Sequence, residues 1–298
     1  MPPSNTGHVA RSVVVTGAST GIGRATALYL AARGWQVFAG VRKPEDGEAL
    51  AASAGGSGGE EAPAGTRIIP LPLDVTDPEQ VEAAVRTVAS GSSETGLAGI
   101  VNNAGIAVTG PMEFLPIGDL REQFEVNVLA QVAVTQAFLP MIRQSGGRLV
   151  FVGSVSGLVS SRMLGAYAAS KFAMEAVVDA FRRELHPWRI RVSLVEPGRV
   201  VTPIWQKSVA EGFKRLNRMP PQAPELYHDL LEEMRLTAEV ASKSGSHPDL
   251  VARAVHRALT ARRPRTRYFV GTDAHIINIL RRVLSDPLFD RLIRLTRR

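Results

Sequence analysis

A tyrosine and a lysine four residues apart carry the clearest chemistry in this chain. Tyr167 and Lys171 fall within the helical pattern of residues 165–185, so they share one face of the expected helix. A phenol with a pKa of about 10 is a poor acid–base group at neutral pH, but a nearby ammonium favours the phenolate and lowers that pKa. None of the other three tyrosines has a lysine at this spacing. The pair predicts general acid–base catalysis on a hydroxyl or carbonyl group.

Two serines lie shortly before this pair. Ser154 follows the apolar strand pattern of residues 148–152 and stands 13 residues before Tyr167. At the carboxyl end of a buried strand, its hydroxyl would face the same crevice and hold an oxygen on which negative charge develops. Ser156, two residues further on, is the alternative for this role.

A glycine-rich turn stands near the N-terminus, between a strand pattern at residues 12–15 and a helical pattern that begins near Ile22. Its sequence is TGASTGIG, from Thr16 to Gly23. Glycines let the backbone turn sharply and approach a pyrophosphate, and the helix N-terminus adds free N–H groups and the positive end of a dipole. The turn predicts a dinucleotide site, although its GxxxGxG spacing differs from the more common GxGxxG.

The elements that must position these residues alternate between strand and helix. Strands are expected at residues 12–15, 36–41, 67–71, 97–101, 148–152, 189–195 and 267–270, and helices at 22–32, 78–89, 119–143, 165–185 and 251–260. Such alternation predicts a parallel sheet covered by helices on both faces, and strands that are apolar throughout agree with burial on both faces. We expect a single doubly wound, Rossmann-like α/β domain over residues 1–298.

Three segments fall outside the alternation. Residues 51–65 are small and polar, which predicts a flexible surface insertion without chemistry of its own. Residues 202–246 follow the sixth strand, at the sheet edge where α/β proteins place ligand-covering loops. We predict a helical substrate lid there, with an ordinary surface excursion as the alternative. Residues 273–298 carry two short amphipathic patterns, which predict a basic helical tail.

The glycine turn resembles that of classical short-chain dehydrogenases/reductases, which have TGxxxGIG at this place. Later motifs of the family also occur in order: NNAG at residues 102–105, an asparagine in the following helix (Asn127), a serine after the fifth strand (Ser154), YxxxK at 167–171, and PG with a following threonine (Pro197, Gly198, Thr202). The match covers roughly two thirds of the chain, from about residue 13 to residue 202, and the motifs together are very specific. The family spacing favours Ser154 over Ser156.

The resemblance implies hydride transfer between a nicotinamide and an alcohol or carbonyl carbon. Tyr167 would exchange the hydroxyl proton, Ser154 would hold the oxygen, Lys171 would lower the tyrosine pKa and orient the ribose, and Asn127 would anchor a proton-relaying water. The residues implied to hold the dinucleotide are Gly17, Ser19, Thr20, Gly21, Ile22, Gly23, Arg42, Asp74, Val75, Asn103, Ala104, Gly105, Tyr167, Lys171, Pro197, Gly198, Val200 and Thr202.

The end of the second strand bears on the choice of cofactor. Proteins that prefer NAD place an acidic residue there for the ribose 2′-hydroxyl, whereas an arginine accommodates the 2′-phosphate of NADP. Here Val41 occupies the acid position, Arg42 and Lys43 follow, and no carboxylate occurs before Glu45. Arg42 could stack on adenine and pair with a phosphate. The segment predicts NADP(H), with NAD(H) as the alternative.

Composition excludes several other classes of protein. Hydrophobic residues make up 45% and charged residues 21% of the 298 residues, as in soluble globular proteins. The chain has no cysteine, which excludes disulfide scaffolds and thiolate zinc sites, and its six histidines show no HExxH or clustered spacing, so we expect no metal. No stretch approaches the roughly 18 uninterrupted apolar residues of a spanning helix. Because the N-terminus also lacks the apolar core of a secretory signal, we predict a cytoplasmic location.

The net charge of +7 comes from the end of the chain. Residues 251–298 hold twelve arginines and three aspartates, whereas the remainder has a small acidic excess. Their neighbours are mostly aliphatic rather than aromatic, so we do not expect nucleic-acid binding. Two interpretations of the tail stay open: helices packed on the domain or on a neighbouring subunit, and peripheral contact with an anionic membrane surface.

The lid, the tail and the segment AGVR at residues 39–42 are similar to the hydroxysteroid and retinol dehydrogenase-like branch of the family. The resemblance implies a hydrophobic alcohol or carbonyl substrate, steroid-, retinoid- or lipid-like. Through the long helices at 119–143 and 165–185, it also implies a homodimer or homotetramer. The alternatives are a 3-oxoacyl thioester reductase and a dinucleotide-binding regulatory protein without catalysis. The intact Ser–Tyr–Lys set argues against the regulatory protein, which would have no chemical use for these groups.

Overall fold

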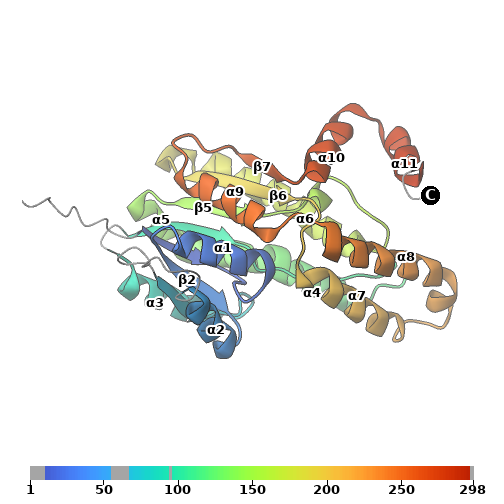
Figure 1. The fold of residues 1–298 in the computed structure, drawn as a ribbon, viewed down its shortest axis with the longest axis horizontal. Helices are drawn as coiled ribbons and strands as arrows, with labels where there is room; N and C mark the ends of the chain where they lie inside the picture. Colours follow the sequence, from blue (N-terminus) through green and yellow to red (C-terminus); the bar gives the residue numbers. More distant parts are fainter. Residues whose placement is uncertain (1–10, 55–66, 94–95, 296–298) are drawn as a thin grey trace, which may run out of the picture.

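Seven parallel strands form one sheet in this computed structural model, which describes residues 11–54, 67–93 and 96–295 (Figure 1). The strands are β1 (Arg11–Val15), β2 (Trp35–Val41), β3 (Arg67–Pro72), β4 (Leu97–Asn102), β5 (Arg148–Val152), β6 (Arg191–Pro197) and β7 (Arg267–Val270). Their order in the sheet is β3-β2-β1-β4-β5-β6-β7. The predicted doubly wound α/β fold is confirmed.

Helices cover both faces of the sheet. They are α1 (Gly21–Ala31), α2 (Pro44–Ala54), α3 (Pro78–Gly91), α4 (Ile117–Phe124), α5 (Ala130–Ser145), α6 (Gly165–Glu184), α7 (Pro203–Leu216), α8 (Gln222–Ser244), α9 (Pro248–Thr260), α10 (Thr272–Val283) and α11 (Asp286–Leu295). The first apolar core joins α1, α2 and α9 to the sheet, and the second joins α3, α5 and α6 to it. Within β1, Val13 and Val15 belong to the first core and Val14 to the second, which is why these three consecutive residues are all apolar.

The order of the strands reverses between β1 and β4. Doubly wound sheets bind ligands at such a switch point, in the crevice outside the carboxyl ends of the strands. The glycine turn follows β1, Arg42 follows β2, and residues 103–105 follow β4. Ser154 and Gly198 follow β5 and β6 along the same edge. The topology therefore gathers the predicted site residues on one side of the sheet.

One helix replaces part of the expected insertion. Residues 51–54 belong to α2 and not to a flexible segment, whereas residues 55–65 lie outside the described part of the chain. The helix begins with Pro44, has acidic residues in its first turn, and buries Gly47 and Leu50. Because only these two residues of α2 are buried, its sequence shows little apolar periodicity.

The long helix predicted at residues 119–143 extends over Ile117–Ser145 and contains a π-helical turn, Glu125–Leu129. Its length and composition would suffice to cross a membrane. In this fold it is a core helix, because three large apolar side chains of α5 are fully buried in the second core. Such π turns often occur at functional sites, and this one contains Asn127.

The residues of the expected lid fold into α7 and α8. Both helices pack on the loop after β4 through a third apolar cluster, which includes Val108, Leu216 and Leu231. The tail forms α10 and α11, at the same end of the molecule as α8 (Figure 1).

Candidate active site

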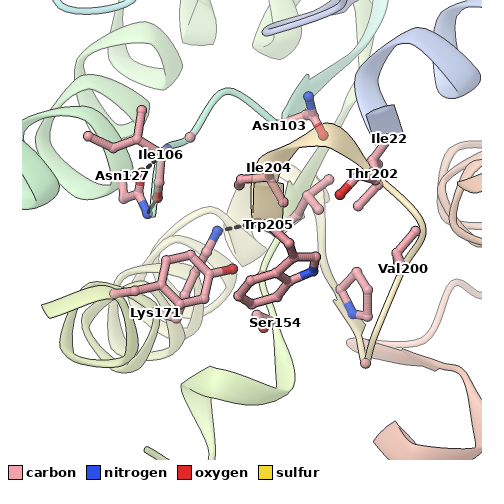
Figure 2. Close-up of a pocket in the computed structure, with 16 residues that line it drawn as sticks. Ile22, Asn103, Ile106, Asn127, Ser154, Lys171, Val200, Thr202, Ile204 and Trp205 are labelled. Carbon is pink, nitrogen blue, oxygen red and sulfur yellow. Dashed lines mark hydrogen bonds between the residues drawn. The ribbon is translucent and has the colours of Figure 1, made fainter. Parts of the chain in front are cut away.

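A pocket opens at the carboxyl ends of the central strands (Figure 2). Predicted site residues that line it are Ile22, Asn103, Gly105, Asn127, Ser154, Tyr167, Lys171, Pro197, Gly198, Val200 and Thr202. The other lining residues are Ile106, Val152, Gly153, Ile204 and Trp205, which no motif marks. The fold thus brings the residues expected for proton transfer and for the nicotinamide into one space.

The rest of the predicted cofactor residues lie along the neighbouring strand ends, outside this pocket: Gly17, Ser19, Thr20, Gly21, Gly23, Arg42, Asp74, Val75 and Ala104. Gly17 has a φ of +63°, and a Cβ atom there would lie 2.8 Å from Cα of Ala104. Gly21 has a φ of +55°, and a Cβ atom there would lie 3.2 Å from the side chain of Thr202. Only glycine adopts such angles freely. Bare backbone at the N-terminus of α1 fits a pyrophosphate.

Two polar side chains hold the glycine turn in place. Thr16 Oγ1 accepts hydrogen bonds from the backbone N–H groups of Asn103 and Ala104, at 2.9 and 3.0 Å. Asn103 Nδ2 donates to the carbonyls of Thr16 and Gly17, at 2.9 and 3.0 Å. Asn103 therefore ties the end of β4 to the end of β1. Thr16 begins the TGxxxGIG motif, but no role for its side chain was predicted from the sequence.

Tyr167 and Lys171 lie close together on α6, with Lys171 Nζ 5.8 Å from the centre of the tyrosine ring. The lysine ammonium donates a hydrogen bond to the carbonyl of Val152, at 2.9 Å (Figure 2). Ser154 Oγ accepts a hydrogen bond from the backbone N–H of Ser156, at 3.1 Å. Of the two serines, Ser154 lines the pocket, and Ser156 supports it through the backbone.

Burial changes the proton affinity of both catalytic candidates. It raises the pKa of Tyr167, and hydrogen bonding with Ser154 opposes that rise. It lowers the pKa of Lys171 from 10.5 to about 8, so the lysine stays largely charged at neutral pH. The pKa of Tyr167 is thus raised, whereas a neighbouring ammonium predicted a lowered pKa; burial is the largest cause of the change.

Asn127 joins the π turn to the loop after β4. Its Oδ1 accepts a hydrogen bond from the N–H of Ile106 at 2.9 Å, and its Nδ2 donates to the carbonyl of Ile106 at 3.0 Å (Figure 2). Nδ2 also lies 3.2 Å from Oγ of Ser170. These bonds show a positioning role for Asn127 at the pocket wall, and the anchoring of a water there stays a prediction.

A larger cavity of about 670 Å³ adjoins the pocket and shares Ser154, Gly198 and Trp205 with it. Its walls come largely from α7, α8, α10 and α11, and apolar side chains such as Ile277 and Phe289 predominate. Trp205 lines both spaces and meets the ring of Tyr167 edge-on, with 6.3 Å between ring centres. The tail helices are therefore packed on the domain, where they complete the cavity.

The comparison with known proteins agrees with these motifs. The family model of short chain dehydrogenases matches residues 11–212, more than half of the chain. The chain belongs to the short-chain dehydrogenase family. Retinol dehydrogenase 5 from Mus musculus is 35% identical over 272 residues, which cover 89% of this chain and 82% of that protein. The NADPH-dependent 3-dehydrocapnine reductase from Ornithobacterium rhinotracheale is 33% identical and covers 95% of each chain.

A solved structure shares this architecture at low identity. The crystal structure of a short-chain dehydrogenase from Burkholderia cenocepacia in complex with NADP has a TM-score of 0.71 and 25% identity, over 95% of this chain and 98% of that one. The present short-chain dehydrogenase is thus an oxidoreductase that uses a nicotinamide dinucleotide on alcohol or carbonyl groups. The prediction of an enzyme is confirmed, and a regulatory protein without catalysis is set aside.

Asp74, which the family resemblance assigns to the adenine, also has local partners in this short-chain dehydrogenase. Its Oδ1 accepts hydrogen bonds from N and Oγ1 of Thr76, at 3.0 and 2.7 Å. The cap of α3 is supplied instead by Asp77, which accepts from the N–H groups of Glu79 and Gln80. Asp74 is therefore free of the capping role and is held at the sheet edge beside Val75, where the contact with adenine stays a prediction.

A buried cluster of charges lies next to the pocket residues Pro197 and Gly198. Glu196 is fully buried, and Nε of Arg267 lies 3.4 Å from its Oε1. Arg267 also pairs with Glu175 at 2.6 Å and with Asp179 at 3.3 Å. Arg267 is shared among three carboxylates, of which only Glu196 is fully buried. Burial and the charge of Glu175 therefore raise the pKa of Glu196 to about 8.

We predict that Glu196→Gln stabilises the enzyme at alkaline pH. A carboxyl whose pKa rises from 4.5 to about 8 on folding binds more protons in the folded than in the unfolded state, so its contribution to the free energy of unfolding falls as pH rises through that interval. Glutamine cannot gain the buried charge. The melting temperature of the variant should exceed that of the wild type by roughly 3 °C or more at pH 9, and the two should converge near pH 5.

Thermal unfolding followed by circular dichroism measures both values, with the exposed Glu184→Gln on α6 as the control. A variant less stable than the wild type at pH 9 would show that attraction to Arg267 outweighs the cost of burial.

Proposed function

We propose that this short-chain dehydrogenase interconverts a hydrophobic secondary alcohol and its ketone, or an alcohol and its aldehyde, with NADP(H). The observation that carries the proposal is the apolar cavity of about 670 Å³ that adjoins Ser154. Its volume lies in the range of pockets for drug-sized ligands and suits a steroid-, retinoid- or lipid-like molecule. Relatives named as a retinol dehydrogenase and as an NADPH-dependent reductase support the same proposal.

Three side chains would handle the substrate oxygen and its proton. The bound nicotinamide supplies the hydride for reduction of a carbonyl, or accepts it when an alcohol is oxidised. Tyr167 gives its phenol proton to the substrate oxygen during reduction and takes it back during oxidation. Ser154 donates a hydrogen bond to that oxygen. Lys171 favours the phenolate that reduction leaves behind, and it binds the ribose hydroxyls.

The cofactor residues divide along the sheet edge in this proposal. The pyrophosphate is held by the glycine turn, which comprises Gly17, Ser19, Thr20, Gly21, Ile22 and Gly23. The adenine is held by Asp74 and Val75. The path between pyrophosphate and adenine is lined by Asn103, Ala104 and Gly105, and the nicotinamide is covered by Pro197, Gly198, Val200 and Thr202. Asn127, which bonds to Ile106 at the pocket wall, anchors the water of a proton relay through Lys171.

Reduction of ketones of increasing apolar size, with NADPH, tests the substrate class. We expect kcat/KM to rise from a short aliphatic ketone to steroid or retinoid carbonyls, since each buried CH₂ contributes about 0.8 kcal/mol. Leu280 lines the cavity from α10. Leu280→Trp should lower kcat/KM for the large carbonyl at least about tenfold and change that for the short ketone much less.

Val283→Trp, on the exposed side of the same helix, is the matched control and should behave as the wild type. Faster reduction of 3-oxoacyl thioesters than of any steroid or retinoid carbonyl would favour the thioester alternative and overturn the proposed substrate class.

The preference for NADP(H) depends on Arg42. Val41 is buried at the end of β2, Arg42 and Lys43 are exposed, and the first carboxylate is Glu45 in α2. We expect tighter binding of NADPH than of NADH, and we expect Arg42→Glu to weaken NADPH binding at least about tenfold, because a charge-assisted hydrogen bond contributes about 1.5–3 kcal/mol. NADH binding should change little. Fluorescence titration measures both cofactors, and equal affinities of the wild type would contradict the proposal.

The same proposal places the enzyme in the cytoplasm as a homodimer or homotetramer. Leu129 and Phe172, on the π turn and on α6, are 55% and 42% exposed. Apolar side chains at the surface of these two helical runs support an interface with a second copy.

A further inference from the structure

Four large apolar side chains of the C-terminal helices are exposed. Ile276, Ile279 and Val283 on α10 are 50%, 59% and 75% exposed, and Leu288 on α11 is 55% exposed. The first three stand at positions i, i+3 and i+7, so they form one stripe along α10. Exposure of such a stripe to water is unfavourable unless another apolar surface covers it.

The stripe adjoins the face of α10 that lines the large cavity. Ile277 and Leu280 line the cavity, so α10 has one broad apolar face. One part of this face lines the cavity, and the other part is exposed at the surface of the molecule. On α8, Leu236 and Val240 also line the cavity, although they are 53% and 52% exposed. These half-exposed lining residues mark where the cavity opens to the surface, on a side of the molecule that α8 and the tail share.

Basic side chains accompany the exposed stripe. Arg281 and Arg282 lie between Ile279 and Val283 on α10, Arg291 follows Leu288 on α11, and all three arginines are exposed. Arg281 pairs with Asp286. Over the tail itself, residues 272–298, six arginines stand against three aspartates. A surface that covers this region must therefore offer both apolar groups and negative charge.

A second copy of the chain meets these requirements poorly. Contact between two tails would bring two arginine-rich segments together. The rest of the chain, residues 1–271, has 29 lysines and arginines against 25 aspartates and glutamates, and so has no acidic excess to offer. A bilayer that contains anionic lipids supplies acyl chains for the stripe and phosphates for the arginines, and each basic residue near such a surface contributes about 1 kcal/mol.

We infer that α10 and α11 bind the surface of an anionic membrane, with Ile276, Ile279 and Val283 entering the acyl boundary and the arginines paired with lipid phosphates. The opening marked by Leu236 and Val240 then lies close to the bilayer, where apolar substrates concentrate. Membrane binding itself is independent of the proposed function, and only the route of substrate entry rests on it.

Co-sedimentation of the full chain with vesicles tests this inference. We expect binding to an equimolar mixture of phosphatidylcholine and phosphatidylglycerol, loss of that binding at high salt, and little binding to phosphatidylcholine alone. Ile279→Ser/Val283→Ser and Arg282→Gln/Arg291→Gln should each weaken binding at least about tenfold. The matched controls are Leu226→Ser/Leu250→Ser and Arg86→Gln/Arg121→Gln, which alter exposed residues of the same kinds elsewhere.

Reduction of a short water-soluble ketone shows separately that each variant is folded and active. Absence of salt-sensitive sedimentation by the wild type would overturn the inference, whether or not the enzyme reduces ketones. Binding by the tail variants equal to that of the controls would also overturn it. A third outcome would overturn the inference: the wild type binds no lipid, and the Ile279→Ser/Val283→Ser variant has a lower native mass than the wild type. That outcome would show that a second copy of the chain covers the stripe.

Discussion

Tyr167→Phe should lower kcat/KM about 10²–10⁴-fold, the range that a general acid–base group contributes. The ring of Tyr167 is buried and meets Trp205 edge-on, so phenylalanine preserves the packing and removes only the hydroxyl. Without that hydroxyl, no group on α6 in the pocket except the ammonium of Lys171 could exchange a proton with the substrate, and that ammonium already donates to the carbonyl of Val152. Binding of the dinucleotide should remain as in the wild type.

Steady-state kinetics and a fluorescence titration together measure this prediction. Tyr227→Phe is the control, because Tyr227 belongs to the lid helix α8 and its hydroxyl donates to Glu113 rather than facing the pocket. Turnover by Tyr167→Phe at the wild-type rate would remove Tyr167 from the role of acid and base. Loss of dinucleotide binding in the same variant would instead indicate damage to the pocket.

The sheet could be predicted from the sequence because its strands carry their own signals. Every residue of β2 is buried, and all but Gln36 are apolar or glycine, as burial on both faces of the sheet requires. The helix α2 gives no comparable signal, since it buries only Gly47 and Leu50 and its remaining residues are small or polar. Its second half could therefore be mistaken for the start of a flexible insertion.

Some features of the candidate site could likewise be predicted from the sequence, and others could not. Asn103, Ser154 and Gly198 could be predicted because each directly follows a strand or nearly so, and parallel strands bring those ends to one edge. The large cavity could not be predicted from the sequence, because its walls form only where α10 and α11 pack beside α7 and α8. An amphipathic pattern shows that a helix has an apolar face but does not identify the surface that covers it. The direction of the pKa change at Tyr167 likewise depends on burial, which only packing determines.

Lys171→Met should lower kcat/KM about 10²–10³-fold, the loss that follows removal of one preorganised electrostatic group, without lowering the stability of the enzyme at pH 7. Folding lowers the pKa of Lys171 from 10.5 to about 8, so the unfolded state binds more protons between these values and the stability of the wild type rises with pH there. Below pH 8 the buried ammonium therefore opposes folding by at most about 3 kcal/mol. Methionine removes that cost and gives up one hydrogen bond to Val152, which contributes about 0.5–3 kcal/mol.

Urea unfolding at pH 7 and at pH 10, beside the kinetics, separates the two roles that the lysine could have. If Lys171 acts on the phenolate and the ribose, activity falls and dinucleotide binding weakens while the free energy of unfolding at pH 7 stays level or rises; the advantage of the variant then shrinks towards pH 10, as the wild type loses its charge. If the lysine serves only to hold the carbonyl of Val152 at the end of β5, stability and activity fall together at both pH values. A charged group that the fold keeps in its interior at a net cost in stability is explained by the chemistry of the pocket and not by the packing of α6.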